Sequence, residues 1–255
     1  MKKYDYSKQN IINTLKAVGL KKDDTVFCHS NILNFGIPKC GLDKNKLANL
    51  FFNSFFEILG NYGTLILPTF SYSFSSNKIY YPNKSRTICG FFPDTIRKIN
   101  KNFSLYPDPN VSCIVFGKHR KYLSIVDDKN SYGEKSLFAK FLGLNGKICN
   151  LNLDAGSTFL HFLERKLKIK YRFDKNFKGK IKTGNKIIND NFTIFVIYKK
   201  IKKKVTFKKF TEYAKKRNYY LEHNLGRGKI GLIKSSDCYK ILKSKLISDK
   251  NFLFE

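Results

Sequence analysis

Thr158, His161 and Glu164 lie at successive steps of three within residues 156–166, which read GSTFLHFLERK. Residues three apart are neighbours on an α-helix, so the Glu164 carboxylate can reach the His161 imidazole one turn away. A carboxylate bound to one ring nitrogen fixes the tautomer and makes the other nitrogen a better proton acceptor. Because a free imidazole titrates at about pH 6.5, this spacing indicates a general base.

A structural explanation of these residues remains open. His161 can lie on a partly apolar helix face beside a surface glutamate, and Ser157 or Thr158 can serve only as a helix cap. The preceding residues favour a functional site, because a strand-like run at 147–153 and a Gly-containing turn at 154–156 lead into the helix. This order places the helix start at the carboxyl edge of a sheet, where open α/β folds bind their ligands.

The sequence offers this base no nucleophile. It contains no Gly-X-Ser-X-Gly elbow. Cys28 and His29 are adjacent in a predicted strand, where neighbouring side chains point to opposite faces, so they do not form a catalytic pair. A base without a nucleophile suits direct transfer to an acceptor that must lose a proton.

Helical and apolar strand patterns alternate over the first 150 or so residues. A helix is expected from the cap at Ser7 to Gly19, and a second follows the cap at Asp43. The remaining elements expected here are strands at 24–30, 63–70, 112–117 and 147–153, helices at 93–99 and from Ser136, and a stop for the second helix at Gly60. The alternation predicts an α/β sheet covered by helices on both faces.

Residues 71–90 have no clear period and are rich in Ser, Tyr and Asn. A long irregular insertion in a compact domain is usually functional or disordered, and the aromatic residues of this one favour an ordered, functional segment. Tyr72, Tyr80 and Tyr81 are candidates for stacking on a nucleotide base or a sugar ring.

The residues after 175 carry a different pattern. Gly184 and Asn185 between two β-like runs predict a hairpin, and residues 192–198, FTIFVIY, predict a further strand. Helices are expected at 206–218, with Phe207, Phe210 and Tyr213 facing inward, and near the C-terminus, with Ser236 or Asp237 as the cap. No linker or repeat interrupts the chain. We therefore expect one domain over 1–255, with core motifs in 1–175 and an elaboration in 176–255.

Six segments in order resemble motifs of the aminoglycoside 3-N-acetyltransferase family and of its relatives that N-acylate sugars. They are FCHSNILNFG, GTLILPTFSYSF, SRTICGFFPDTIRK, DPNVSCIVFG, YGEKSLF and GSTFLHFLERK. Each is a weak signal alone, whereas six in the family's order are fairly specific. The resemblance runs from about residue 7 to 175.

This resemblance implies a single α/β/α layered acyltransferase domain that uses acetyl-CoA, or another acyl-CoA, and no metal. It implies that His161 is the base that takes a proton from the acceptor amine and that Glu164 is its partner. The segments that would lie along CoA are His29, Ser30, Asn31, Ile32 and Leu33, and Thr69, Phe70 and Ser71. Candidates for the acceptor side are Tyr72, Ser112, Ser136 and Thr158.

Asp108 departs from the family pattern. Many drug-modifying members have His before Pro at this point, whereas this chain has Asp108 before Pro109 and lacks the preceding Arg-Ser. The Asp108 carboxylate can accept a hydrogen bond from the acceptor, which makes it a candidate catalytic residue. It can equally form an Asx turn.

The formal net charge of +30 bears on the choice of acceptor. Aminoglycosides are polycations, and the chain has 19 acidic residues against 49 basic ones. Charge attraction favours an anionic acceptor. We therefore predict N-acylation, most simply N-acetylation, of a nucleotide-linked amino sugar for surface polysaccharide synthesis. An aminoglycoside 3-N-acetyltransferase in the strict sense is the alternative.

A basic nucleic-acid-binding protein is the alternative from another class. The basic residues are scattered through every segment, and the densest run, YKKIKKKV at 198–205, has no interleaved aromatic platform. We therefore expect no nucleic-acid partner. A relative that binds CoA or a sugar without catalysis is a further alternative, which the intact His161 and Glu164 disfavour.

The N-terminal residues MKKYDYSKQN lack the apolar core of a secretory signal. No apolar run approaches the roughly 18 residues of a membrane-spanning helix. These features predict a cytoplasmic protein without membrane insertion. The six cysteines form no CxxC pair, which predicts buried structural thiols. Nothing in the sequence indicates the oligomeric state.

Overall fold

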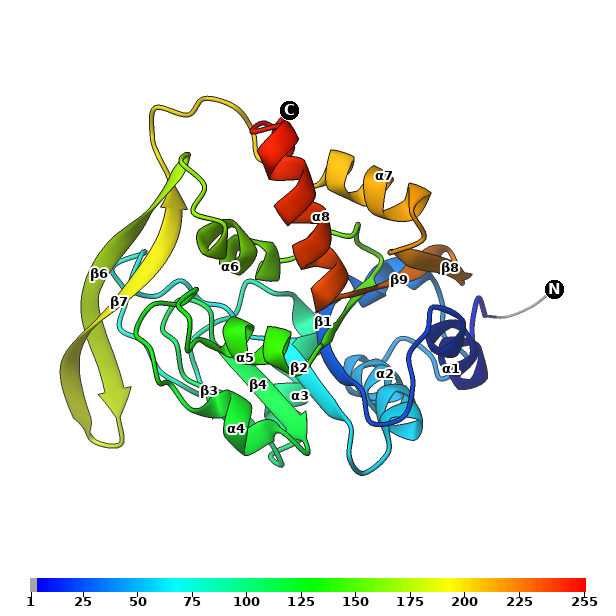
Figure 1. Cartoon of the computed structure of the whole chain (residues 1–255). Helices are drawn as coiled ribbons and strands as arrows, with labels where there is room; N and C mark the ends of the chain where they lie inside the picture. Colours follow the sequence, from blue (N-terminus) through cyan, green and yellow to red (C-terminus); the bar gives the residue numbers. More distant parts are fainter. Residues whose placement is uncertain (1–3) are drawn as a thin grey trace.

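A seven-stranded sheet runs through the centre of the computed structural model, which describes residues 4–255 (Figure 1). Residues 1–3, which open the stretch interpreted as non-secretory, lie outside the described part. The strands in spatial order are β3 (Ser104–Tyr106), β4 (Cys113–Gly117), β2 (Thr64–Pro68), β1 (Thr25–Ser30), β5 (Lys147–Leu151), β9 (Gly228–Lys234) and β8 (Leu221–Leu225). β1 is parallel to both of its neighbours, and the other pairs are antiparallel.

Alternate side chains of the central strands build two separate cores, because successive residues of a strand point to opposite faces. On one face Phe27 and Ile148 pack against the helices α5 (Leu137–Gly143), α6 (Phe159–Lys166), α7 (Lys208–Lys216) and α8 (Ser235–Ser248). On the other, Cys28 and Cys149 pack against α1 (Lys8–Ala17), α2 (Lys44–Leu59) and α3 (Phe91–Ile99). The predicted α/β/α layering is confirmed.

Polar side chains begin several helices where the sequence predicted. The Ser7 hydroxyl accepts a hydrogen bond from the Asn10 amide, and the Asn10 side-chain oxygen accepts one from the Ser7 amide. The Asp43 carboxylate caps α2 by accepting a hydrogen bond from the Lys46 amide at 2.8 Å, and the Ser136 hydroxyl caps α5. The predicted cap of α8 at Ser236 or Asp237 is wrong. That helix starts at Ser235 without a side-chain cap, because β9 runs directly into it.

A long two-stranded ribbon projects from one side of the molecule (Figure 1). Its strands are β6 (Arg172–Thr183) and β7 (Lys186–Ile197), joined by the predicted turn at Gly184 and Asn185. Gly184 has φ of 56°, which suits a glycine in a tight hairpin turn. The sequence suggested a short hairpin and a separate strand, whereas the structure joins them into one strand of twelve residues.

The last part of the chain contributes to the central sheet. β9 pairs antiparallel with β5 through Ile148 and Ile233, and β8 forms the edge beside it. The sequence pattern of β8, LEHNL, is polar and did not predict a strand. Other elements that were not predicted are β9 itself, the short β3, a 3-10 turn at Ile32–Phe35 and the helix α4 (Arg120–Ser124).

The cysteines are all free thiols. Four of them are buried, as predicted, while Cys89 is half-buried. The expectation fails at Cys40, which is exposed.

Candidate active site

His161 and Glu164 meet on α6 in the geometry that their spacing predicted. His161 Nδ1 lies 2.6 Å from Glu164 Oε2. The Glu164 side chain is 0% exposed, whereas the His161 side chain is 22% exposed. The pair therefore presents one accessible imidazole held by one inaccessible carboxylate.

Two further residues hold the Glu164 carboxylate. The Tyr171 hydroxyl donates to Oε1 at 2.5 Å, and Arg172 Nε lies 3.1 Å from Oε2. Tyr171 lies at the end of the turn that follows α6, and Arg172 is the first residue of β6. Neither residue was predicted from the sequence, because Glu164 was not expected to be buried; a buried carboxylate needs donors beyond one imidazole.

These contacts determine the ionisation of Glu164. Burial raises the pKa of this carboxyl, but the charge and hydrogen bond of His161, the Arg172 guanidinium and the Tyr171 hydroxyl together outweigh burial. The net effect is a pKa below the ordinary value for glutamate. An ionised carboxylate accepts the Nδ1 proton of His161, which leaves Nε2 as the nitrogen able to accept a proton.

Aromatic side chains enclose the His161 ring. The Tyr132 ring stands edge-on to it at 5.9 Å between centroids, and the Phe207 ring lies at 6.1 Å. Phe207 also packs on Gly156, where a Cβ would lie 2.3 Å from the Phe207 ring. Gly156 thus lets the start of α6 and the start of α7 approach closely.

His29 connects the end of β1 to the start of α6. Its Nε2 lies 2.9 Å from the Ser157 hydroxyl oxygen, which accepts a hydrogen bond from the Phe159 amide. Ser157 is therefore the residue that caps α6 through its side chain, whereas Thr158 makes no capping bond. Burial lowers the pKa of His29 to about 4, so this imidazole is neutral at neutral pH.

The residues predicted along CoA fall into two groups. His29 and Ser30 are half-buried at the end of β1, and Leu33 is 56% exposed. Ile32, Thr69 and Phe70 are buried. The first group, at the surface, can contact a ligand at the end of β1. The second, buried group supports the first from within the fold.

The start of α3 lies next to the end of β1. A Cβ on Gly90, the residue before this helix, would lie 3.7 Å from the Ser30 carbonyl oxygen. Gly90 has φ of 86° and makes no side-chain cap, so the first amides of α3 point out of the helix beside Ser30. Asn31 and Ser71 are the remaining residues predicted along CoA. The Ser71 hydroxyl donates a hydrogen bond to the Pro109 carbonyl.

Two of the four residues predicted on the acceptor side have hydrogen-bond partners within the fold. The Ser112 hydroxyl donates to the Thr69 carbonyl at 2.7 Å, and the Ser136 hydroxyl caps α5. Tyr72 is half-buried with φ of 47°. Thr158 is half-buried in the turn before His161.

Asp108 lies inside the protein with its carboxylate fully engaged. The side chain is 0% exposed and accepts hydrogen bonds from the Asn110 and Val111 amides and from the Ser131 hydroxyl. This is the geometry of an Asx turn, and it favours the structural alternative for Asp108 over direct contact with an acceptor.

The insertion at 71–90 is ordered against the ribbon. The Tyr80 amide donates to the Lys180 carbonyl at 2.8 Å, and the Lys182 amide donates to the Tyr80 carbonyl at 2.9 Å. The Tyr80 ring is buried with Phe74 and Phe192. The expectation that Tyr80 stacks on a ligand is therefore wrong, because its ring belongs to this small core.

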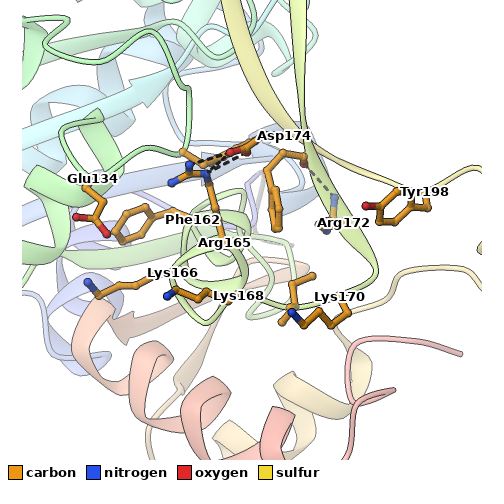
Figure 2. Close-up of a pocket in the computed structure, with 12 residues that line it drawn as sticks. Glu134, Phe162, Arg165, Lys166, Lys168, Lys170, Arg172, Asp174 and Tyr198 are labelled. Atoms are coloured by element: carbon orange, nitrogen blue, oxygen red, sulfur yellow. Dashed lines mark hydrogen bonds and ion pairs between the residues drawn. The ribbon is translucent and has the colours of Figure 1, made fainter.

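A cavity of about 500 Å³ lies between α6 and the ribbon, and its lining residues do not include His161 or Glu164 (Figure 2). Its walls include Tyr132, which contacts His161, and Arg172, which contacts Glu164. Figure 2 shows Arg165 paired with Asp174 through two hydrogen-bonding nitrogens and, in a row along one side, the lysines Lys166, Lys168 and Lys170. The cavity therefore carries an excess of positive charge.

Within residues 4–255, no helix is both long and apolar enough to cross a bilayer. No three His, Cys, Asp or Glu side chains in that range gather in a way that could hold a metal ion.

The layered α/β fold and the histidine held by a buried carboxylate agree with an acyltransferase. Residues 28–246 match the sequence profile of the aminoglycoside 3-N-acetyltransferase family, and the chain belongs to this family. The family and the class of enzyme predicted from the six motifs are confirmed.

Known relatives agree with this assignment. The SPbeta prophage-derived aminoglycoside N(3')-acetyltransferase-like protein YokD of Bacillus subtilis (strain 168) is 26% identical over 258 residues, or 91% of this chain and 86% of YokD. The crystal structure of aminoglycoside acetyltransferase AAC(3)-Xa superposes with a TM-score of 0.80 at 16% identity, covering 96% of this chain and 93% of that one. The complex of AAC-IIIb with CoASH also gives 0.80 at 16%, covering 95% and 97%.

Proposed function

We propose that this protein transfers an acetyl group from acetyl-CoA to the amino group of an amino sugar, with His161 as the general base. The observation that carries this proposal is the accessible His161 imidazole held by the buried, ionised Glu164. The family assignment supplies the class of reaction, and the pair supplies the proton acceptor that such a reaction needs.

The proposed reaction is a single displacement. Acetyl-CoA supplies a thioester carbonyl, which the acceptor amine attacks. His161 Nε2 takes a proton from the amine as the new C–N bond forms, and the resulting imidazolium is stabilised by Glu164. The C–S bond breaks, and the proton held by His161 leaves with the sulfur as a thiol. Tyr171 and Arg172 keep the Glu164 carboxylate aimed at Nδ1 throughout.

The end of β1 is the proposed place for CoA. AAC-IIIb, which shares this fold, has been solved with CoASH. In this chain Ser30 and Leu33 are accessible there, and the first amides of α3 open beside Ser30. Helix N-terminal amides bind phosphate through hydrogen bonds and the helix dipole, so they suit the anionic part of CoA.

The first candidate acceptor is an aminoglycoside-type amino sugar. AAC-VIa has been solved with sisomicin and an AAC(3)-IVa mutant with apramycin, and both share the fold of this chain. A family named for acetyl transfer to aminoglycosides makes this acceptor class the direct expectation.

A second candidate is an anionic, nucleotide-linked amino sugar. The net charge of +30 and the lysine row of the cavity between α6 and the ribbon favour an anionic acceptor over a polycation. Only Glu134 and Asp174 supply negative charge to that cavity, and Asp174 is already paired with Arg165.

Thiol release from acetyl-CoA with a panel of acceptors tests the proposal. Apramycin and sisomicin would be compared with a uridine-diphosphate-linked amino sugar and with the same amino sugar without the nucleotide. Turnover with the drugs supports the first candidate, and turnover that requires the nucleotide supports the second. If none of these amines is acetylated while the protein binds acetyl-CoA, the proposed acceptor class is wrong.

A further inference from the structure

A second cavity, of about 790 Å³, lies on the other side of the turn that follows α6. Its walls come from this turn, from the loop after β7 and from the C-terminal half of α8, which lie near one another in Figure 1. Lys168, Ile169 and Lys170 separate it from the cavity of Figure 2. We call it the α8 groove, lined by Leu167, Lys168, Ile169, Lys170, Tyr171, Lys200, Ile201, Lys202, Lys203, Leu242, Lys243, Leu246, Ile247, Lys250, Asn251 and Phe254.

The floor of the α8 groove is apolar. Leu242 and Phe254 are buried beneath it, and Leu246 and Ile169 are half-buried. Ile247 stands at its margin with 79% of its surface exposed, the largest exposure among the large hydrophobic side chains of the described chain. Because this exposed isoleucine borders the apolar floor, a hydrophobic ligand can keep apolar contact from the surface into the groove.

The charged residues that line the α8 groove are all basic. Seven lysines line it, at positions 168, 170, 200, 202, 203, 243 and 250, and the lining includes no Asp or Glu. None of these seven forms an ion pair within residues 4–255, although the Lys203 ammonium donates to Asn251 at 3.1 Å. The neighbouring Asp249 is engaged elsewhere, at 3.7 Å from Lys209.

We propose that the α8 groove binds a single-chain anionic amphiphile, such as a fatty carboxylate, with its tail on the apolar floor and its head among the lysines. The cavity volume lies within the usual range of sites for small ligands, roughly 300–1,000 Å³. Seven uncompensated lysines repel a cationic ligand and a second copy of this basic chain. The recessed floor suits an entering chain better than a flat bilayer surface.

The α8 groove also touches the residue that holds Glu164. The Tyr171 ring forms part of its wall and packs edge-on against Phe254 at 4.6 Å, while the Tyr171 hydroxyl donates to Glu164. A bound tail would therefore contact the aromatic cluster behind the His161–Glu164 pair. The binding proposal itself does not depend on the acetyl-transfer proposal.

Calorimetric titration of the full chain tests the proposal, with dodecanoate, decanoate and dodecyltrimethylammonium each kept below its micelle concentration. We expect saturable one-to-one binding of dodecanoate, weaker binding of decanoate and none of the cation. Burial of two additional methylenes should tighten binding by up to about fifteenfold. Absent dodecanoate binding, or equal binding of the cation, would overturn the proposal.

Variants of exposed residues locate the site without risk to the fold. Ile247→Ser and Lys243→Glu should each weaken dodecanoate binding at least about fivefold, through lost apolar contact and lost charge attraction respectively. Ile187→Ser and Lys186→Glu on the ribbon are matched controls at exposed positions and should leave binding unchanged. If all four variants bind alike, the ligand lies elsewhere. Binding to anionic vesicles that depends on Ile247, without dodecanoate binding, would replace the proposal with a membrane surface.

Discussion

The Glu164 carboxylate is the most constrained group near the candidate base. It is fully buried, and three side chains donate to it or pair with it: His161, Tyr171 and Arg172. Removal of one partner from a buried charge leaves an uncompensated group, which costs more than an ordinary surface hydrogen bond. The orientation of His161 therefore depends on Tyr171 and Arg172 as well as on Glu164.

We expect Tyr171→Phe to lower kcat about tenfold and to leave the KM for acetyl-CoA nearly unchanged. The change removes the hydroxyl that fixes Glu164 Oε1 but keeps the ring that packs on Phe254. Tyr122→Phe is the control, because that tyrosine is exposed on α4, and its kinetics should match the parent chain. Equal kcat in the Tyr171 variant and the parent would show that Tyr171 has no positioning role.

His29 predicts a pH dependence of stability. Its native pKa of about 4 lies below the value of about 6.5 expected in the unfolded chain. Between these two pH values the unfolded chain binds a proton that the native chain does not, so stability falls as the pH drops through this window and is fully present above about pH 6.5. Urea midpoints measured at pH 7 and pH 4.5 should therefore fall less in His29→Gln than in the parent. Identical falls would exclude His29 as a cause.

At the scale of single residues, the sequence predicted the contact between His161 and Glu164, because both belong to one helical turn, where spacing alone determines proximity. It could not predict the hydrogen bond of His29 to Ser157, since those residues meet only through the pairing of β1 with β5. The burial of Tyr80 was missed for the same reason. Its neighbours Phe74 and Phe192 come from the insertion and from the ribbon.

Among the elements, helix caps were the most predictable features. A cap is a local event between a side chain and an amide two or three residues later, so Ser7, Asp43 and Ser136 could be identified from the chain alone. The start of α8 was predicted wrongly because a strand continues directly into the helix and leaves no capping position. The polar strand β8 was missed because its pairing with β9, and not its own pattern, makes it a strand.

Asp43→Ala should lower the free energy of unfolding by about 1 kcal/mol, because the Lys46 amide at the start of α2 loses its side-chain acceptor. Denaturant unfolding measures this loss. Ser236→Ala serves as the comparison, since Ser236 was the predicted cap of α8 and the structure gives it no such role. A change of less than about 0.5 kcal/mol is expected there. A larger loss at Ser236 than at Asp43 would contradict the assigned helix starts.

At the scale of the whole molecule, the boundary near residue 175 marks the end of the family motifs. It does not mark a clear division in the structure. β9 lies beside β5 in the central sheet, and residues of α7 and α8 join the core that also holds α5 and α6. The sequence could not indicate this, because the motif resemblance fades where these elements begin. The description of the chain as one domain over 1–255 stays a proposal.

A fragment of residues 1–175 should fail to fold cooperatively. It would expose the edge of β5 that pairs with β9 and the apolar surface that α7 and α8 cover. Circular dichroism during thermal unfolding, with the full chain as the reference, measures the outcome. A sharp transition in the fragment would show that residues 176–255 are a separable addition.

Comparison of His161→Ala with the parent chain is the most direct test of the proposed mechanism. With acetyl-CoA and the best acceptor from the panel, we expect turnover to fall about 10²- to 10⁴-fold. Calorimetry should show nearly unchanged CoA affinity, since the segments assigned to CoA lie on β1 and after β2. Such a result would identify His161 as the base of the transfer. Unchanged turnover in the variant would contradict the mechanism and leave the His161–Glu164 pair as a structural part of α6.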